Sequence, residues 1–161
     1  PFKLFESWYE EAKKNEINDP NALSLATTDK SGKPSVRMLL LKGINEKGFI
    51  FYTNLKSKKS LDLKENPQAS MCFYWDSLGI QVRIIGSVHQ VSDWEADNYF
   101  ATRDRKTQLG AWASRQSHPL KNMPELIKKF KNNEILLKIF LKTFLQGLKI
   151  YLNYYFFCVS I

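Results

Sequence analysis

The fold of this 161-residue chain is decided by one stretch, ALSLATTDKSGKPSVRMLLLKGINEKGFIFY, which covers residues 22–52. It contains apolar runs of strand length, separated by tight turns rich in Gly, Asn, Asp and Lys. The runs are residues 22–28, 35–42 and 49–52, and the turns are residues 29–34 and 45–48. Short apolar runs joined by such turns are typical of antiparallel hairpins. The stretch therefore predicts consecutive antiparallel strands.

The flanking sequence predicts further strands and several helices. Large apolar residues recur at helical spacing over residues 1–15, at Phe2, Phe5, Trp8, Tyr9 and Ala12. Ser92 and Glu95 form a capping box, which opens a helix that ends near Thr102. The other predicted elements are a helix at 57–65, strands at 69–75 and 80–91, an irregular polar segment at 103–121 and a helix at 123–131. Together they predict an α+β fold, a small antiparallel barrel with flanking helices.

The composition fits a single domain that spans residues 1–161 and binds an anion. A chain of 18.8 kDa with 43% hydrophobic residues can fill one core and is too short for two ordinary domains. Its 24 basic and 16 acidic residues give a net charge of +8, which suits an anionic ligand or a nucleic acid. Two cysteines and two histidines offer neither a disulfide framework nor a metal constellation. With no signal-peptide pattern at the start, they predict a cytoplasmic protein without a bound metal.

The last 27 residues, 135–161, differ in composition from the rest, because no acidic residue follows Glu134. Lys138, Lys142, Gln146, Lys149 and Asn153 would share one stripe of a helix. Residues 148–154 also alternate in the manner of a strand, so both interpretations stay open. The lysines interrupt every apolar run before it reaches spanning length, which argues against a transmembrane helix.

Two basic clusters are candidate anion sites. Ser57, Lys58 and Lys59 stand where a helix is predicted to begin, so backbone amides, a hydroxyl and two cations would face a phosphate. The alternative is a solvated charge run that includes Lys56. The second cluster is RDRKTQ, residues 103–108. Two separate clusters fit a pair of phosphorylated small molecules as well as one nucleic-acid backbone.

Gln81 and Arg83 share one face of a predicted strand whose other residues are apolar. A buried Gln needs hydrogen-bond partners, which the edge of a heterocycle would supply. An ordinary polar residue on a half-solvated strand is an equally supported interpretation. No Ser or Cys has a base at activating spacing, so a hydrolytic triad is not predicted.

A set of motifs in fixed order resembles the pyridoxamine 5'-phosphate oxidase family over roughly residues 1–134. The blocks are DP (19–20), RMLLLK (37–42), GFIFYTNLKSKK (48–59), ENP (65–67), QVRIIG (81–86) and YFATRDRKTQLGAWASRQS (99–117). The most specific are YTN-x-x-S-x-K and R-x-R-x-x-Q-x-GAW-x-S-x-QS. The resemblance implies a flavoprotein with an FMN-binding split barrel, which works as a homodimer with FMN at the subunit interface.

The resemblance also implies roles for individual residues. The FMN phosphate would be held by Arg37, Lys58 and Lys59, with Ser117 nearby. The rest of the flavin would be lined by Met38, Leu39, Leu40, Leu41, Lys42, Tyr52, Thr53, Gln81 and Gln116. The phosphate of the substrate would be bound by Lys42, Tyr99, Arg103 and Thr107. The family often has Arg in place of Lys58 and usually has Ser in place of Thr107.

The implied reaction belongs to vitamin B6 metabolism. It oxidises pyridoxamine or pyridoxine 5'-phosphate to pyridoxal 5'-phosphate, with O2 as the acceptor. The family's final Arg-x-His-Asp-Arg block is not found in residues 135–161, so we expect a truncated or altered C-terminal part, no assignable catalytic residue and impaired turnover. Two alternatives stay open: an FMN-binding split barrel without this oxidase activity and, less favoured, a basic nucleic-acid-binding barrel.

Overall fold

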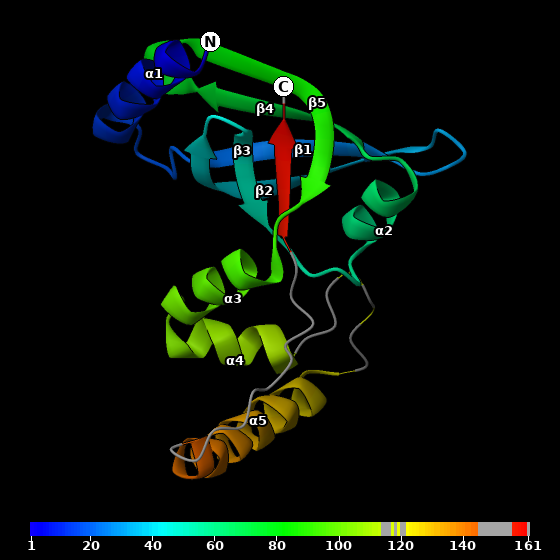
Figure 1. Cartoon of the computed structure of the whole chain (residues 1–161). Helices are drawn as coiled ribbons and strands as arrows, with labels where there is room; N and C mark the ends of the chain where they lie inside the picture. Colours follow the sequence, from blue (N-terminus) through cyan, green and yellow to red (C-terminus); the bar gives the residue numbers. More distant parts are fainter. Residues whose placement is uncertain (114–116, 118, 120–121, 145–155, 161) are drawn as a thin grey trace.

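The computed structural model shows an antiparallel barrel with helices at its ends (Figure 1), and it describes residues 1–113, 117, 119, 122–144 and 156–160. The strands are β1 (Ala22–Thr28), β2 (Pro34–Asn45), β3 (Gly48–Tyr52), β4 (Gln68–Trp75), β5 (Ile80–Gln90) and β6 (Phe156–Ser160). They pair in the order β1-β2-β3-β6-β5-β4, and β4 pairs with β1 to close the barrel. The predicted α+β barrel with flanking helices is confirmed.

The barrel is filled by the alternating residues of its strands. Leu23, Leu25 and Thr27 of β1 are buried, while the residues between them are only half-buried. This alternation follows from the two-residue period of a strand. The helix α1 (Phe2–Asn15) covers one end, where Phe5 lies with its ring centroid 5.1 Å from that of Phe73 and 5.6 Å from that of Trp75. Phe5, Phe49, Phe51, Phe73 and Trp75 therefore belong to one continuous core.

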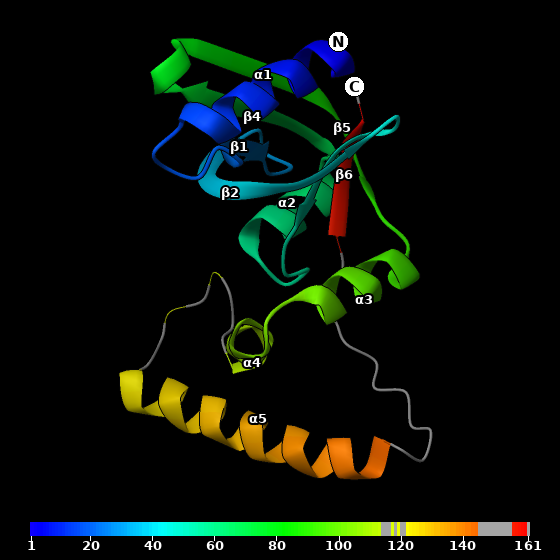
Figure 2. The same ribbon diagram turned by 90° about the vertical axis from the view of Figure 1, so that its left-hand side faces the viewer.

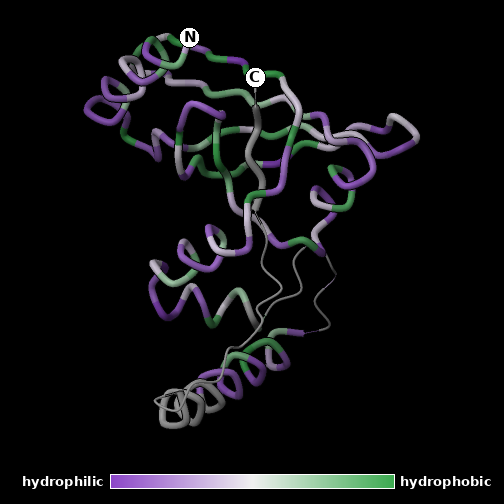
Figure 3. The backbone as a smooth tube through the Cα atoms, in the orientation of Figure 1, coloured by the Kyte–Doolittle hydropathy of each residue, from purple (hydrophilic) through white to green (hydrophobic). Residues whose placement is uncertain are grey.

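The other helices are placed around and beyond the opposite end of the barrel. They are α2 (Lys58–Glu65), α3 (Asp93–Thr102), α4 (Arg105–Ala113) and α5 (Met123–Phe144), with a 3₁₀ turn, η1, at Asp76–Leu78. The helix α2 packs against β1, and α5 packs beside α4 (Figures 1 and 2). Figure 3 shows that α1, α2 and α3 each carry both hydrophilic and hydrophobic residues. No helix in the described ranges is long and apolar enough to span a membrane.

The structure corrects the predicted irregular segment at 103–121, because residues 105–113 form α4. Two local features hold this helix. The carboxylate of Asp104 accepts a hydrogen bond from the Thr107 amide at 3.0 Å, which caps the helix N-terminus. The Gln108 side chain donates to the carbonyl oxygens of Phe100 and Arg103, each at 3.0 Å, and so joins α4 to the end of α3.

The described part of the C-terminal segment supports the helical interpretation up to Phe144, and the strand interpretation of residues 148–154 stays a prediction. The predicted helix at 123–131 continues to Phe144, so Lys138 and Lys142 lie on α5. Further on, β6 pairs with β3 and β5 and completes the barrel. The alternating residues 148–154 lie outside the described residues. Part of this segment is therefore helix and part is strand.

Candidate functional site

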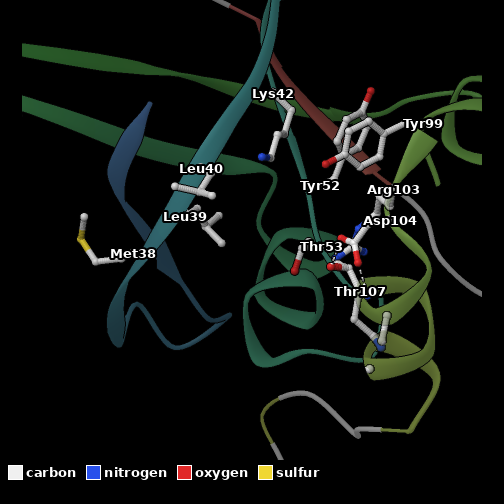
Figure 4. A pocket seen from close by; sticks show the side chains of 13 residues that line it. Met38, Leu39, Leu40, Lys42, Tyr52, Thr53, Tyr99, Arg103, Asp104 and Thr107 are labelled. Atoms are coloured by element: carbon white, nitrogen blue, oxygen red, sulfur yellow. Dashed lines mark hydrogen bonds between the residues drawn. The ribbon is translucent and has the colours of Figure 1, made fainter. Parts of the chain in front are cut away.

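A pocket with a cavity volume of about 800 Å³ lies between strands β2 and β3 and the helices α3 and α4 (Figure 4). Most residues that line it are ones that the sequence marked: Met38, Leu39, Leu40, Lys42, Tyr52, Thr53, Tyr99, Arg103 and Thr107. The structure adds Asn54, Asp104, Gly110 and Ala111, to which the sequence assigned no individual role. Asp104 had a usable signal, because an acidic residue three positions before Thr107 is a helix-capping pattern. Residues far apart in the chain thus meet at one cavity.

Lys42 lies on the outward-facing side of β2, in phase with Met38 and Leu40, and lines the pocket with them. The β2–β3 pairing shifts register between Leu41 and Gly43, as at a β-bulge. Leu41 is only 3% exposed and belongs to the core, whereas Lys42 is exposed and lines the pocket. The flavin contact that the resemblance implies for Leu41 stays a prediction.

Two aromatic rings form part of the pocket wall. Tyr52 at the end of β3 and Tyr99 on α3 stack with ring centroids 3.6 Å apart and an interplanar angle of 24° (Figure 4). Burial raises the pKa of Tyr99, and the positive charge of Arg103 opposes this shift. The Tyr99 phenol therefore stays protonated near neutral pH. The paired rings offer a flat apolar surface with polar groups close by.

The junction of α3 and α4 contributes both a cation and a carboxylate to the pocket. Arg103 ends α3, and its guanidinium lies over the Phe100 ring at 5.8 Å from the centroid. Asp104 follows directly, and the hydroxyl of Thr107 donates a hydrogen bond to its carboxylate (Figure 4). The hydrogen bonds from Thr107 hold the pKa of Asp104 below its ordinary value. This part of the pocket thus presents opposite charges side by side.

A second group of cations lies where β3 leads into α2. Lys59 is only 4% exposed, and its ammonium donates to Thr53 Oγ1 at 2.9 Å and to Ser57 Oγ at 3.2 Å. Burial and, as a smaller cause, the positive charge of the nearby Arg37 lower the pKa of Lys59 to about 8. Thr53 also lines the pocket, so this cation group adjoins the cavity. The positive end of the helix dipole at the start of α2 adds to its attraction for an anion.

A buried carboxylate organises this cation group. Asp62 on α2 is 2% exposed; it accepts a hydrogen bond from Thr27 Oγ1 at 2.8 Å and one from the Lys58 ammonium. Thr27 Oγ1 in turn accepts a bond of 2.9 Å from the Arg37 guanidinium. Burial lowers the pKa of Arg37, and Asp62 opposes that shift. Arg37 and Lys58 are therefore held by one hydrogen-bonded network centred on Asp62.

Some residues implied by the resemblance lie away from the pocket. Gln81 is exposed on the outer side of β5, and Ser117 lies in an exposed turn with a φ of 65°. Gln116 lies outside the described residues. Arg37, Lys58 and Lys59 stand in the adjoining cation group and do not line the cavity themselves. The cofactor contacts of these residues stay predictions.

The outer face of the barrel carries exposed apolar side chains. Val36, Met38, Tyr74 and Ile85 are 70%, 66%, 63% and 68% exposed. Val36 is in register with Ala26, Ala26 with Ser70, and Ser70 with Ile85, which forms a row across β2, β1, β4 and β5. Exposed apolar side chains gathered on one face of a protein often mark an interaction surface. Gln81 and Arg83 lie on the same strand as Ile85, at positions of the same parity.

Comparison with known proteins was made for sequence and for structure. The sequence profile described as pyridoxamine 5'-phosphate oxidase matches residues 9–132. A protein of Pelagibacter ubique named pyridoxine/pyridoxamine 5'-phosphate oxidase is 56% identical over 127 residues, which are 79% of this chain and 61% of that protein. A protein of the same name from Bradyrhizobium sp. strain BTAi1 is 57% identical over 122 residues, 76% of this chain and 56% of that protein. The chain thus spans about three fifths of the length of these curated relatives.

Two solved structures resemble the whole barrel. PhzG from Burkholderia lata 383, solved in complex with tetrahydrophenazine-1-carboxylic acid, has a TM-score of 0.87 at 26% identity and covers 99% of this chain and 75% of its own. A pyridoxamine 5'-phosphate oxidase-related, FMN-binding protein from Nostoc punctiforme has a TM-score of 0.74 at 16% identity, with coverage of 99% and 80%. The second likeness concerns the fold alone.

Proposed function

The chain belongs to the pyridoxamine 5'-phosphate oxidase family, and we propose that it binds FMN and oxidises pyridoxamine or pyridoxine 5'-phosphate to pyridoxal 5'-phosphate, with O2 as acceptor. One observation carries the proposal. The cavity is lined by the cations Lys42 and Arg103, and it adjoins a second group of cations at Lys59, which donates a hydrogen bond to the lining residue Thr53. Two phosphorylated ligands that meet in one pocket require such an arrangement.

The residues at the α2 end fit the phosphate of FMN. Arg37, Lys58 and Lys59 supply positive charge, and hydroxyl groups lie within hydrogen-bond reach of them. From there the ring system would extend along residues 38–42 and past Tyr52 and Thr53, with Gln81, Gln116 and Ser117 as further contacts. Bound FMN would supply the two-electron acceptor for the substrate and pass the electrons to O2.

The residues at the α3–α4 end fit the phosphate of the substrate. Lys42 and Arg103 would pair with the phosphate, and Tyr99 and Thr107 would add hydroxyl groups. Binding energy gained at the phosphate would orient the rest of the substrate in the pocket. The chain's own residues thus act by positioning and charge, and no residue of the described part is assigned a proton-transfer role.

The exposed apolar side chains on the outer face of the barrel fit a second copy of the chain. Val36, Met38 and Ile85 would be covered in a homodimer, whose interface would exclude water from them. Gln81 lies on that outer side and not in the pocket of its own chain. In the dimer it would reach the pocket of the other subunit, with FMN bound at the interface. We place this homodimer in the cytoplasm, the compartment in which the free thiol of Cys72 would stay reduced.

The test begins with the visible absorbance spectrum of the purified protein after addition of FMN and gel filtration. Oxidised-flavin bands that elute with a particle of dimer size support FMN binding and the homodimer. Pyridoxine 5'-phosphate added without O2 should then bleach the bands, and O2 should restore them. Retained flavin that is not bleached would support the FMN-binding barrel without oxidase activity. Protein that retains no flavin with FMN in excess would overturn the proposal.

A further inference from the structure

We propose that Asp104 is a specificity-determining residue that weakens the binding of doubly charged phosphate groups at the Lys42 and Arg103 end of the pocket. The inference rests on the proposed function, because it concerns the phosphate of the same substrate. Asp104 lines the cavity together with Lys42, Arg103 and Thr107. Asp104 brings a negative charge to a part of the pocket whose other polar residues would attract an anion.

The hydrogen bonds of Asp104 bear directly on the substrate site. Its carboxylate accepts the Thr107 amide at 3.0 Å and also the Thr107 hydroxyl (Figure 4). A hydroxyl has one proton to donate. While Thr107 donates that proton to Asp104, it cannot donate it to a phosphate. Asp104 therefore competes with the ligand for the hydroxyl that the ligand would use.

The charge of Asp104 acts in the same direction. Hydrogen bonds from Thr107 and the charge of Arg103 keep the pKa of this carboxyl low, so it stays ionised near neutral pH. A phosphate monoester carries a charge near −2 there, because its second pKa is about 6. Like charges in one pocket repel, and the carboxylate also offsets part of the attraction from Arg103. The site then holds a phosphorylated ligand less tightly than its cations alone would.

Asparagine at this position separates the electrostatic role from the structural one. Asn is as good a helix cap as Asp, so the Asp104→Asn variant should keep α4 in place. The Asn amide can donate to Thr107 Oγ1, which leaves the hydroxyl proton free for the ligand. We expect the FMN-loaded variant to bind a phosphorylated ligand about 3- to 10-fold more tightly than the unchanged protein.

The experiment measures binding of 4-deoxypyridoxine 5'-phosphate to the FMN-loaded protein by flavin absorbance. This analogue lacks the reacting hydroxyl, so turnover does not disturb the equilibrium. Asp97→Asn on α3 is the matched control, because it makes the same charge change at an exposed position that does not line the pocket. Unphosphorylated 4-deoxypyridoxine shows whether the effect depends on the phosphate.

Tighter binding of the phosphorylated analogue in Asp104→Asn, with no change for Asp97→Asn or for the unphosphorylated analogue, supports the inference. A second comparison adds Asp104→Asn to a protein that already carries Thr107→Val. The increase in affinity caused by Asp104→Asn should be smaller there, because the hydroxyl for which Asp104 and the ligand compete is absent. Unchanged or weaker binding in Asp104→Asn overturns the inference and leaves the proposed function standing. If flavin is retained but no variant binds the analogue, the substrate assignment and the inference both fail.

Discussion

The two cationic ends of the pocket are built in different ways. At the α2 end, Lys59 and Asp62 are 4% and 2% exposed, and each makes hydrogen bonds to neighbouring side chains. At the α3–α4 end, Lys42 and Asp104 are exposed, and the helix cap is the main fixed contact. Burial strengthens charge interactions and holds side chains in place, whereas exposure lets water screen them. The α2 end therefore suits a tightly bound ligand, and the α3–α4 end suits ligands that bind and dissociate repeatedly.

Removal of Asp62 should have the largest effect, because it disrupts the hydrogen-bonded network that distinguishes the α2 end from the α3–α4 end. In Asp62→Ala, Thr27 and Lys58 lose a buried acceptor, and Arg37 loses the network that orients it. We expect the free energy of unfolding to fall by about 3 kcal/mol, because a buried hydrogen-bonded carboxylate is lost. FMN retention should fall with it. Urea unfolding and an FMN titration measure both, with Glu65→Ala on the same helix as control, since Glu65 is exposed. Equal stability of the two variants would contradict the network.

Removal of Arg37 should affect the ligand more than the fold. Arg37→Ala takes one cation from the α2 end, and we expect FMN affinity to fall by about 2 kcal/mol, roughly 30-fold. The far-ultraviolet circular dichroism spectrum should not change. Lys30→Ala in the exposed β1–β2 turn provides a control with the same loss of charge. If Arg37→Ala binds FMN as well as the control does, the phosphate site is assigned to the wrong end.

Removal of Arg103 tests the other end alone. Arg103→Ala should raise the KM for pyridoxine 5'-phosphate about tenfold and leave FMN bound, because one phosphate partner is lost from a half-buried position away from the α2 end. Arg105→Ala is the control, since Arg105 pairs with Gln108 and does not line the pocket. Loss of flavin with unchanged KM would show that the two phosphate sites have been exchanged in our assignment.

The smallest expected effect concerns pH and Lys59. The pKa of Lys59 is about 8 in the folded protein and has an ordinary value of 10.5. Between pH 8 and pH 10.5 the unfolded chain therefore holds the Lys59 proton more tightly than the folded protein does. The contribution of Lys59 to the unfolding free energy of FMN-free protein should therefore rise with pH across that window. FMN affinity should fall as pH rises through about 8, because the ammonium loses its charge. Lys59→Arg should keep FMN affinity constant over this range; an identical decline in both proteins would exclude Lys59 as the cause.

Local sequence patterns predicted much of the fold and part of the site. The hairpins within residues 22–52 are confirmed, as is the Ser92 cap, whose hydroxyl oxygen accepts the Glu95 amide at 3.3 Å. Such features depend on residues a few positions apart, so the sequence displays them directly. The helix α4 was missed because its polar composition hides the cap at Asp104 and the contacts of Gln108.

Taken alone, the sequence determined the strands β1–β5, the ends of the early helices, the family motifs and the two basic clusters. The tertiary structure decided which groups the residues of those clusters contact and how deeply they are buried. It buried Lys59 against Thr53, tied Arg37 and Lys58 to Asp62, and set Asp104 inside the pocket with Lys42 and Arg103. It also placed β6 between β3 and β5. The physical reason is that strand pairing and burial depend on which distant segments meet, and the charge, pKa and partners of a side chain follow from that meeting.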